Sequence, residues 1–210
     1  MTQVKICGLS TALTMNAALH AGADFVGLVF FAKSPRHVSI GQASHLASLA
    51  RGRAKIVTLV VDADDQLLRS IATEVNPDYI QAHGQETPTR IAAIHGLTGI
   101  AVYKAVKVRD VAHVVAAESY RSVSPFLLYD AMPPEGAELP GGNGLAFDWN
   151  ILATANQPFM LAGGLTPETV AHAVVKTAAA MVDVSSGVES SPGIKDAGLI
   201  AKFITTAKSA

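Results

Sequence analysis

Short apolar runs alternate along this chain with segments in which apolar residues recur at every third or fourth position. Runs of this length, rich in β-branched residues, are typical of strands buried on both faces, whereas the spacing of three and four residues is typical of amphipathic helices. The pattern predicts eight strands separated by helices. The strands are expected at residues 3–7, 24–29, 54–61, 77–82, 99–106, 125–130, 159–161 and 179–184.

Polar residues that can cap a helix precede most of the helical segments. Ser39, followed three residues later by Gln42, resembles a capping box. Other helix starts are expected at Ser10 or Thr11, at Thr87-Pro88 and at Thr166-Pro167. Further helices are expected at residues 65–75, 108–121 and 196–207, and the longest segment without a period covers residues 131–147.

Strands separated by helices imply a parallel sheet with right-handed crossovers, and eight such units can close into a (β/α)8 TIM barrel. An open, doubly wound sheet is the competing architecture. No charge block, low-complexity tract or linker marks a boundary within the 210 residues. The sequence therefore predicts an α/β protein in which residues 1–210 form one barrel domain.

The overall composition excludes several classes of partner. The formal net charge is −1, and the absence of a Lys/Arg cluster argues against nucleic acid. Hydrophobic residues make up 50% of the chain, but no run is long enough to span a membrane, so no membrane partner is expected. A single cysteine and a start directly in a strand favour the cytoplasm. A monomer and a homodimer both remain open.

Cys7, the only cysteine, ends the first strand, at the edge where parallel α/β folds bind ligands. Alternation along the strand places Lys5 and Cys7 on one face. We hypothesise that Lys5 pairs with Asp183, which is expected to point inward from the eighth strand, and that the positive charge beneath Cys7 favours the thiolate. The alternative is that Cys7 is a small buried hydrophobic residue.

Asp130 ends the apolar sixth strand, where a carboxylate is costly unless it is solvated, paired or functional. Across a barrel mouth, Cys7 and Asp130 would offer a base and an acid on two sides of one ligand. A helix cap or a carboxylate facing water is the alternative for Asp130.

Glycine-rich loops after the last two strands predict a phosphate site, because such loops offer backbone N–H groups to an anion in many barrels. Each loop alone is equally consistent with a tight turn. The candidate residues are Gly163 and Gly164 after the seventh strand and Ser185, Ser186 and Gly187 after the eighth, with a weaker cluster at Gly142 and Gly144.

Two more residues are candidates for substrate contacts. Arg36, in the loop after the second strand, could hold a carboxylate with its planar fork, or it could be a surface arginine. His83 ends the fourth strand on the ligand side, or it is a solvated turn histidine. The seven histidines lack the spacing of a zinc motif, so no metal is expected.

Several motifs together resemble the phosphoribosylanthranilate isomerase family, from the first strand to the last helix. They are Val4-Lys5-Ile6-Cys7-Gly8, Gly22-Ala23-Asp24, Lys33-Ser34-Pro35-Arg36, the run from Gly142 through Phe147-Asp148-Trp149, Leu161-Ala162-Gly163-Gly164-Leu165, and Val182-Asp183-Val184-Ser185-Ser186-Gly187-Val188-Glu189 followed by Pro192-Gly193-Ile194-Lys195-Asp196.

That resemblance implies a (β/α)8 barrel that catalyses an Amadori rearrangement of N-(5'-phosphoribosyl)anthranilate without a metal or organic cofactor. It implies that Cys7 is the general base, that Asp130 is the general acid and that Arg36 holds the anthranilate carboxylate. It also implies phosphate binding by the two glycine-rich loops and a position near the substrate for Asp183. Ala82 and Asn143 depart from the usual family pattern.

Two other functions are compatible with parts of the pattern. An aldolase that forms a Schiff base would need a lysine at a strand end, and Lys104 is the candidate. A phosphate-ligand sensor would keep the glycine loops without turnover, and the presence of both Cys7 and Asp130 argues against it.

Overall fold

The computed structural model describes residues 1–132 and 147–210. Its parallel strands pair in sequence order, and β8 pairs with β1, so the sheet closes into a barrel. This closure confirms the predicted TIM barrel and excludes the open sheet. The barrel strands are β1 (Gln3–Cys7), β2 (Phe25–Phe30), β3 (Lys55–Val60), β4 (Tyr79–Ala82), β5 (Ala101–Val108), β6 (Leu127–Ala131), β7 (Phe159–Leu161) and β8 (Met181–Val184).

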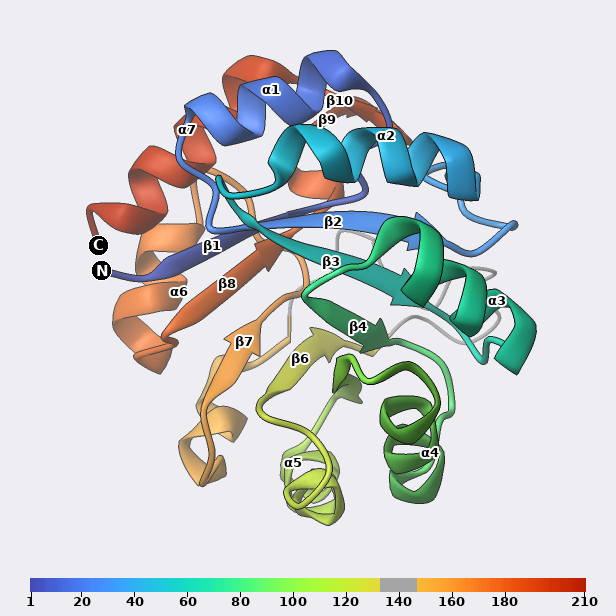
Figure 1. Cartoon of the computed structure of the whole chain (residues 1–210). Coiled ribbons are helices and arrows are strands. Elements are labelled where there is room, and N and C mark those ends of the chain that lie inside the picture. The colour runs from blue at the N-terminus through green and yellow to red at the C-terminus, as the bar shows by residue number, and fades with distance from the viewer. Residues whose placement is uncertain (133–146) are drawn as a thin grey trace.

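The α-helices lie outside the barrel wall (Figure 1). Ser39 caps its helix by accepting a hydrogen bond from the backbone of Gln42, but the predicted capping box is wrong, because the Gln42 side chain donates to the Ser10 carbonyl instead. The helices are α1 (Ala12–His20), α2 (Ile40–Ala50), α3 (Asp65–Ser70), α4 (Pro88–Thr98), α5 (Val111–Ala116), α6 (Val170–Thr177) and α7 (Ala197–Lys208).

Several helical segments differ from the predicted ones. The helix expected at Thr166 begins only at Val170, because Thr166 and Thr169 close a hydrogen-bonded turn first. Four short helices are not α-helical. The π-helix η1 (Ile71–Val75) continues α3 and the 3-10 helix η2 (Ala117–Tyr120) continues α5, and the other two are the 3-10 helices η3 (Trp149–Thr154) and η4 (Ser186–Val188). A two-stranded antiparallel sheet, β9 (Glu189–Ser191) with β10 (Ile194–Lys195), was not predicted. The candidates Gly142 and Gly144, and the departure Asn143, lie outside the described residues.

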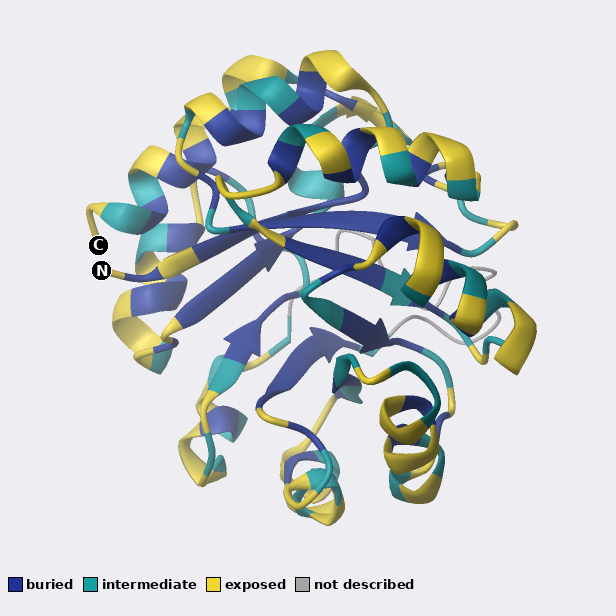
Figure 2. Ribbon diagram, viewed as in Figure 1, coloured by how far each residue is buried: buried dark blue, intermediate teal, exposed yellow. Residues whose placement is uncertain are grey.

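The barrel wall is almost entirely buried, and the helices expose only their outer faces (Figure 2). An apolar cluster fills the barrel interior, and it includes Phe25, Val57, Tyr103, Leu128 and Met160. Because side chains alternate along a strand, Asp130, which lies two positions beyond Leu128 on β6, also faces inward and lies nearer the carboxyl end. None of the described helices is both long and apolar enough to cross a bilayer.

Candidate active site

The predicted pair of Lys5 and Asp183 is present inside the barrel. The two residues are direct register partners on β1 and β8, and the Lys5 Nζ donates to Asp183 Oδ1 over 2.9 Å. The Lys5 side chain is fully buried. Burial alone would lower the pKa of its ammonium group, but the Asp183 carboxylate raises it well above the usual range. Lys5 is therefore a fixed positive charge two residues before Cys7 on the same face of β1.

Cys7 is buried at the end of β1, where its register partner is Gly27 of β2. A Cβ atom at Gly27 would stand 3.0 Å from Cys7 Sγ, so the thiol occupies the space that this glycine leaves. Burial raises the pKa of the Cys7 thiol above its ordinary value, and Lys5, which lowers it, only partly offsets the effect of burial. Lys5 thus favours the thiolate, as hypothesised, but desolvation outweighs its effect, so the net shift of the thiol pKa is upward rather than downward.

Arg36 is buried rather than on the surface. Its side chain crosses Gly8, whose φ of +79° and missing Cβ make room, since a methyl group there would lie 2.6 Å from Arg36 Cδ. The Nε and Nη2 atoms donate to the two carboxylate oxygens of Glu189 over 2.7 and 2.8 Å. The end of the guanidinium that carries Nη1 forms no hydrogen bond within residues 1–132 and 147–210, so a second carboxylate can still be bound end-on.

Glu189 is held from a second side by Lys195. Lys195 Nζ lies 2.6 Å from Glu189 Oε1 and also donates to the carbonyl and hydroxyl oxygens of Ser185. The Ser185 hydroxyl in turn donates to the carbonyl oxygen of Cys7. Burial opposes ionisation of Glu189, but the Arg36 hydrogen bonds and the Lys195 charge lower its pKa to about 2. This chain of bonds ties the loop that carries Arg36 to the ends of β1 and β8.

Glu189→Gln is expected to destabilise the protein by about 3 kcal/mol near neutral pH, because two buried cations lose their partner. A carboxyl with a lowered pKa in the folded state stabilises above its unfolded pKa, and this stabilisation is lost as the pH falls from about 4.5 to about 2. Urea unfolding at several pH values should therefore show the gap between wild type and variant closing in that range.

The matched control is Glu168→Gln, which breaks the exposed pair with Lys202. Because water and salt screen this exposed pair, the control is expected to leave the stability nearly unchanged. A gap between wild type and Glu189→Gln that stays constant down to about pH 2 would contradict the role of the Glu189 carboxylate.

Asp130 is buried at the end of β6, next to two other candidates. His83 Nε2 lies 3.4 Å from Asp130 Oδ2, and the imidazole is buried rather than solvated. A Cβ atom at Gly163 would stand 3.1 Å from Asp130 Oδ1, so the loop after β7 passes directly beside this carboxyl group. Lys107 of β5 is the register partner of Asp130, and burial, with help from the Lys104 charge, lowers the pKa of Lys107.

The two glycine-rich loops are in contact, as their expected shared role requires. A methyl group at Gly187 would overlap the carbonyl oxygen of Leu165, which follows Gly163 and Gly164. Both glycines have positive φ, and their backbone N–H groups form no hydrogen bond among the residues that the structure describes. Ser185, Ser186 and Gly187 remain partly exposed. Free N–H groups on adjoining loops are suited to an anion.

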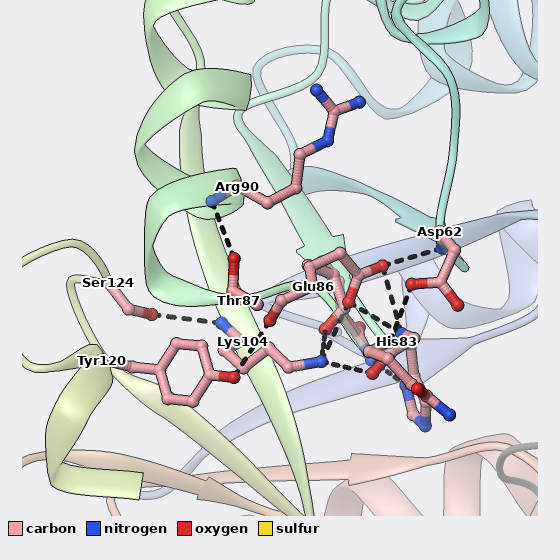
Figure 3. Close-up of polar contacts among 12 residues, drawn as sticks. Asp62, His83, Glu86, Thr87, Arg90, Lys104, Tyr120 and Ser124 are labelled. Carbon is pink, nitrogen blue, oxygen red and sulfur yellow. Dashed lines mark hydrogen bonds and ion pairs between the residues drawn. The ribbon is translucent and has the colours of Figure 1, made fainter.

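Lys104 does not point into the barrel mouth. Its neighbours Tyr103 and Ala105 belong to the interior cluster, so alternation turns Lys104 outward. Its Nζ donates to Glu86 Oε2 over 2.9 Å and to two backbone carbonyls, and Glu86 also accepts from the backbone of Asp62 (Figure 3). Such a lysine fixes the loop beyond His83 and is not available as an imine-forming amine, which removes the basis for an aldolase.

Three residues of this region are not among the site candidates named from the sequence, although Glu189 and Lys195 lie within the quoted family motifs. Gln81 links Tyr103 to His83, Glu189 holds Arg36, and Lys195 holds Glu189. Within the described ranges, no group of His, Cys, Asp and Glu side chains has the arrangement of a metal site.

Comparison with known proteins agrees with this geometry. The family model of N-(5'phosphoribosyl)anthranilate (PRA) isomerase matches residues 4–206. The N-(5'-phosphoribosyl)anthranilate isomerase of Rhodopseudomonas palustris (strain BisA53) is 51% identical over 207 residues, which cover 98% of this chain and 95% of that protein.

Solved structures of similar proteins cover the whole chain. The crystal structure of phosphoribosyl anthranilate isomerase from Thermotoga maritima has a TM-score of 0.90 at 33% identity, with 100% of both chains covered. A phosphoribosyl anthranilate isomerase in complex with reduced 1-(o-carboxyphenylamino)-1-deoxyribulose 5-phosphate has a TM-score of 0.87 at 31% identity, again with 100% of both chains covered.

Proposed function

The chain belongs to the N-(5'-phosphoribosyl)anthranilate isomerase family, and on that premise we propose that Cys7 is the general base and Asp130 the general acid of its reaction. The reaction is the rearrangement of N-(5'-phosphoribosyl)anthranilate to 1-(2-carboxyphenylamino)-1-deoxyribulose 5-phosphate in tryptophan biosynthesis. One observation supports the assignment most strongly. The parallel pairing of β1 to β8 brings the ends of β1, β6, β7 and β8 to the same rim.

The acid acts first in this mechanism. Asp130 gives its proton to the furanose ring oxygen while the bond from that oxygen to C1' breaks, and the lone pair of the anthranilate nitrogen forms the C=N bond of an iminium ion. Asp130 becomes a carboxylate. The Asp130 carboxyl group is buried with the His83 imidazole 3.4 Å away, and an imidazole that donates a hydrogen bond would stabilise the new negative charge.

The base acts second. The Cys7 thiolate removes the proton from C2', and the electrons of the C–H bond move toward the iminium nitrogen to give an enolamine, which becomes the ketose on reprotonation at C1' and loss of the hydroxyl proton. Lys5 supports this step, because its fixed charge lies beside the sulfur and lowers the cost of the thiolate. Asp183 holds Lys5 in place, and the proposal puts Asp183 near the substrate.

Two anionic groups of the substrate have matching sites in the proposal. The N–H groups of Gly163, Gly164 and Gly187 and the hydroxyls of Ser185 and Ser186 bind the phosphate. The Nη1 end of Arg36 binds the anthranilate carboxylate. His83, next to Asp130, contacts the sugar. No cofactor is needed, because the substrate nitrogen accepts the electrons. Gly142 and Gly144 complete the proposed substrate contacts.

The wider context of the protein is also part of the proposal. Residues 1–210 act as one domain on a small phosphorylated substrate in the cytoplasm, without nucleic acid or membrane partners, as a monomer or a homodimer.

The test of the proposed reaction is the fluorescence of the anthranilate-bearing substrate on addition of purified protein. A decay that depends on the protein concentration, and that yields the ketose product by mass spectrometry, is expected. A protein that binds the substrate without consuming it would refute the proposal and leave a binding function.

Arg36→Ala is expected to raise KM by roughly tenfold to a hundredfold with a smaller change in kcat, because a charge-assisted hydrogen-bond pair to the carboxylate is lost. Steady-state kinetics provides the measurement, and Arg53→Ala, at an exposed site, provides the control. An unchanged KM would remove Arg36 from the substrate site. Since this variant also leaves Glu189 unpaired on one side, its folding is checked by thermal unfolding.

A further inference from the structure

A short chain of hydrogen bonds inside the barrel ends on the imidazole beside Asp130. The Tyr103 hydroxyl donates to Gln81 Oε1 over 2.8 Å, and Gln81 Nε2 lies 2.8 Å from His83 Nδ1. Tyr103 and Gln81 are fully buried, and His83 is 6% exposed. These three side chains come from β4, the turn that follows it, and β5, which are adjacent in the barrel wall.

The direction of this chain determines where the proton of the neutral imidazole lies. A glutamine amide has one acceptor oxygen and one donor nitrogen. Because the oxygen accepts from Tyr103, the nitrogen faces His83, and Nδ1 must accept. The ring proton of the neutral imidazole is then on Nε2.

Reversal of the amide would leave a proton without an acceptor. Gln81 would then donate to Tyr103, and the hydroxyl proton of Tyr103 would need another acceptor. Tyr103 makes no other side-chain hydrogen bond among the described residues. Burial raises the pKa of Tyr103 above its ordinary value, so the hydroxyl keeps this proton.

The Nε2 atom is thus a donor that points to the proposed acid. It lies 3.4 Å from Asp130 Oδ2 without forming a hydrogen bond, and it has no other partner among the described residues. A buried donor without a partner costs free energy unless something accepts from it in the working protein. The Asp130 carboxylate that forms when the proton is given away is such an acceptor.

We propose that Gln81, held by Tyr103, is a positioning residue that keeps His83 in the Nε2–H tautomer, so that the imidazole presents a hydrogen-bond donor to Asp130. The contribution to catalysis rests on the proposed function, whereas the tautomer does not. With the proton on Nδ1, the imidazole would direct a lone pair at the carboxylate and would destabilise it.

The tautomer is tested by long-range proton–nitrogen NMR of the imidazole at about pH 8, where an ordinary histidine is neutral. The His83 signals are assigned by their loss in His83→Gln. Asp130→Asn removes the carboxylate that could itself favour Nε2–H, so in this variant Gln81 alone sets the tautomer. A single Nε2–H tautomer is expected in wild type and in Asp130→Asn, and a mixture is expected in the double variant Asp130→Asn/Gln81→Met.

The kinetic arm uses Gln81→Met, which keeps the length of the side chain and removes both hydrogen bonds. We expect kcat to fall roughly tenfold, the effect of about one hydrogen bond, while KM changes little. The control is Thr58→Val, because the Thr58 hydroxyl is also buried and forms no hydrogen bond among the described residues. It should leave kcat and the His83 spectrum unchanged.

Two results would overturn the proposal. One is an Nδ1–H tautomer in wild type, and the other is a single Nε2–H tautomer that persists in the double variant. A protein without isomerase activity would refute the proposed function, but the NMR measurements would still decide the role of Gln81.

Discussion

Asp130→Asn is expected to reduce kcat by roughly two to four orders of magnitude, the range that a positioned general acid contributes. The amide has the volume of the carboxyl group but no proton acidic enough to protonate the ring oxygen. KM should change much less, because the proposed phosphate and carboxylate sites are on other residues. The measurement is steady-state turnover of the fluorescent substrate.

The matched control for Asp130→Asn is Glu74→Gln. This carboxylate is exposed in η1, which precedes β4 and so lies at the opposite end of the barrel. The same chemical change there should leave kcat within about twofold of wild type, since surface substitutions away from the site have small effects. Circular dichroism and thermal unfolding check that both variants fold. A near-normal rate for a folded Asp130→Asn protein would refute the acid role.

Cys7→Ala should cause a loss of similar size, roughly two to four orders of magnitude in kcat, because no other group is assigned to remove the C2' proton. Cys7→Ser keeps the shape with a hydroxyl that does not ionise near neutral pH, and it should be as slow as Cys7→Ala. A Cys7→Ser variant with nearly full activity would refute the assignment of the thiolate as the base.

The pH dependence gives an independent test of Cys7. A base acts in its deprotonated form, and burial raises the pKa of the thiol, so the thiolate fraction at neutral pH is small. In the free enzyme this fraction rises roughly tenfold per pH unit below the pKa. Because Asp130 must also keep its proton, we read the thiolate requirement from the ratio of the wild-type kcat/KM to that of Cys7→Ala, in which the requirement for protonated Asp130 cancels, and we expect this ratio to climb between about pH 7 and about pH 9. A ratio that stays constant over that range would contradict the account.

The strand pattern of the sequence was enough to predict the barrel and one of its internal ion pairs. Lys5 and Asp183 belong to the first and last strands, which become neighbours only if the sheet closes. Alternation then turns both side chains inward. The same rule places Lys104 on the helix side of the wall, because its neighbour Tyr103 faces the interior. A lysine on that side cannot serve as a nucleophile in the barrel mouth.

Other features depend on contacts that no sequence period encodes. Glu189 and Arg36 are 153 positions apart and meet because β9 and β10 fold over the loop after β2. A glutamine in a strand gives no signal of its own, and the role of Gln81 depends on a hydroxyl that is 22 positions away. The direction of the Cys7 pKa shift depends on the extent of burial compared with the charges of Lys5, Asp183 and Lys195, and only the three-dimensional structure provides both.

A crystal structure of this protein in complex with reduced 1-(o-carboxyphenylamino)-1-deoxyribulose 5-phosphate would test the central claim most directly. The account predicts Cys7 Sγ and an Asp130 carboxyl oxygen on opposite sides of the sugar-derived chain, each within about 3 to 4 Å of the carbon or oxygen that it serves. The phosphate should rest on the N–H groups of Gly163, Gly164 and Gly187. The account would be contradicted by an analogue that binds with Cys7 Sγ too far from C2' to remove its proton, or with the Asp130 carboxyl group too far from the oxygen that it should protonate.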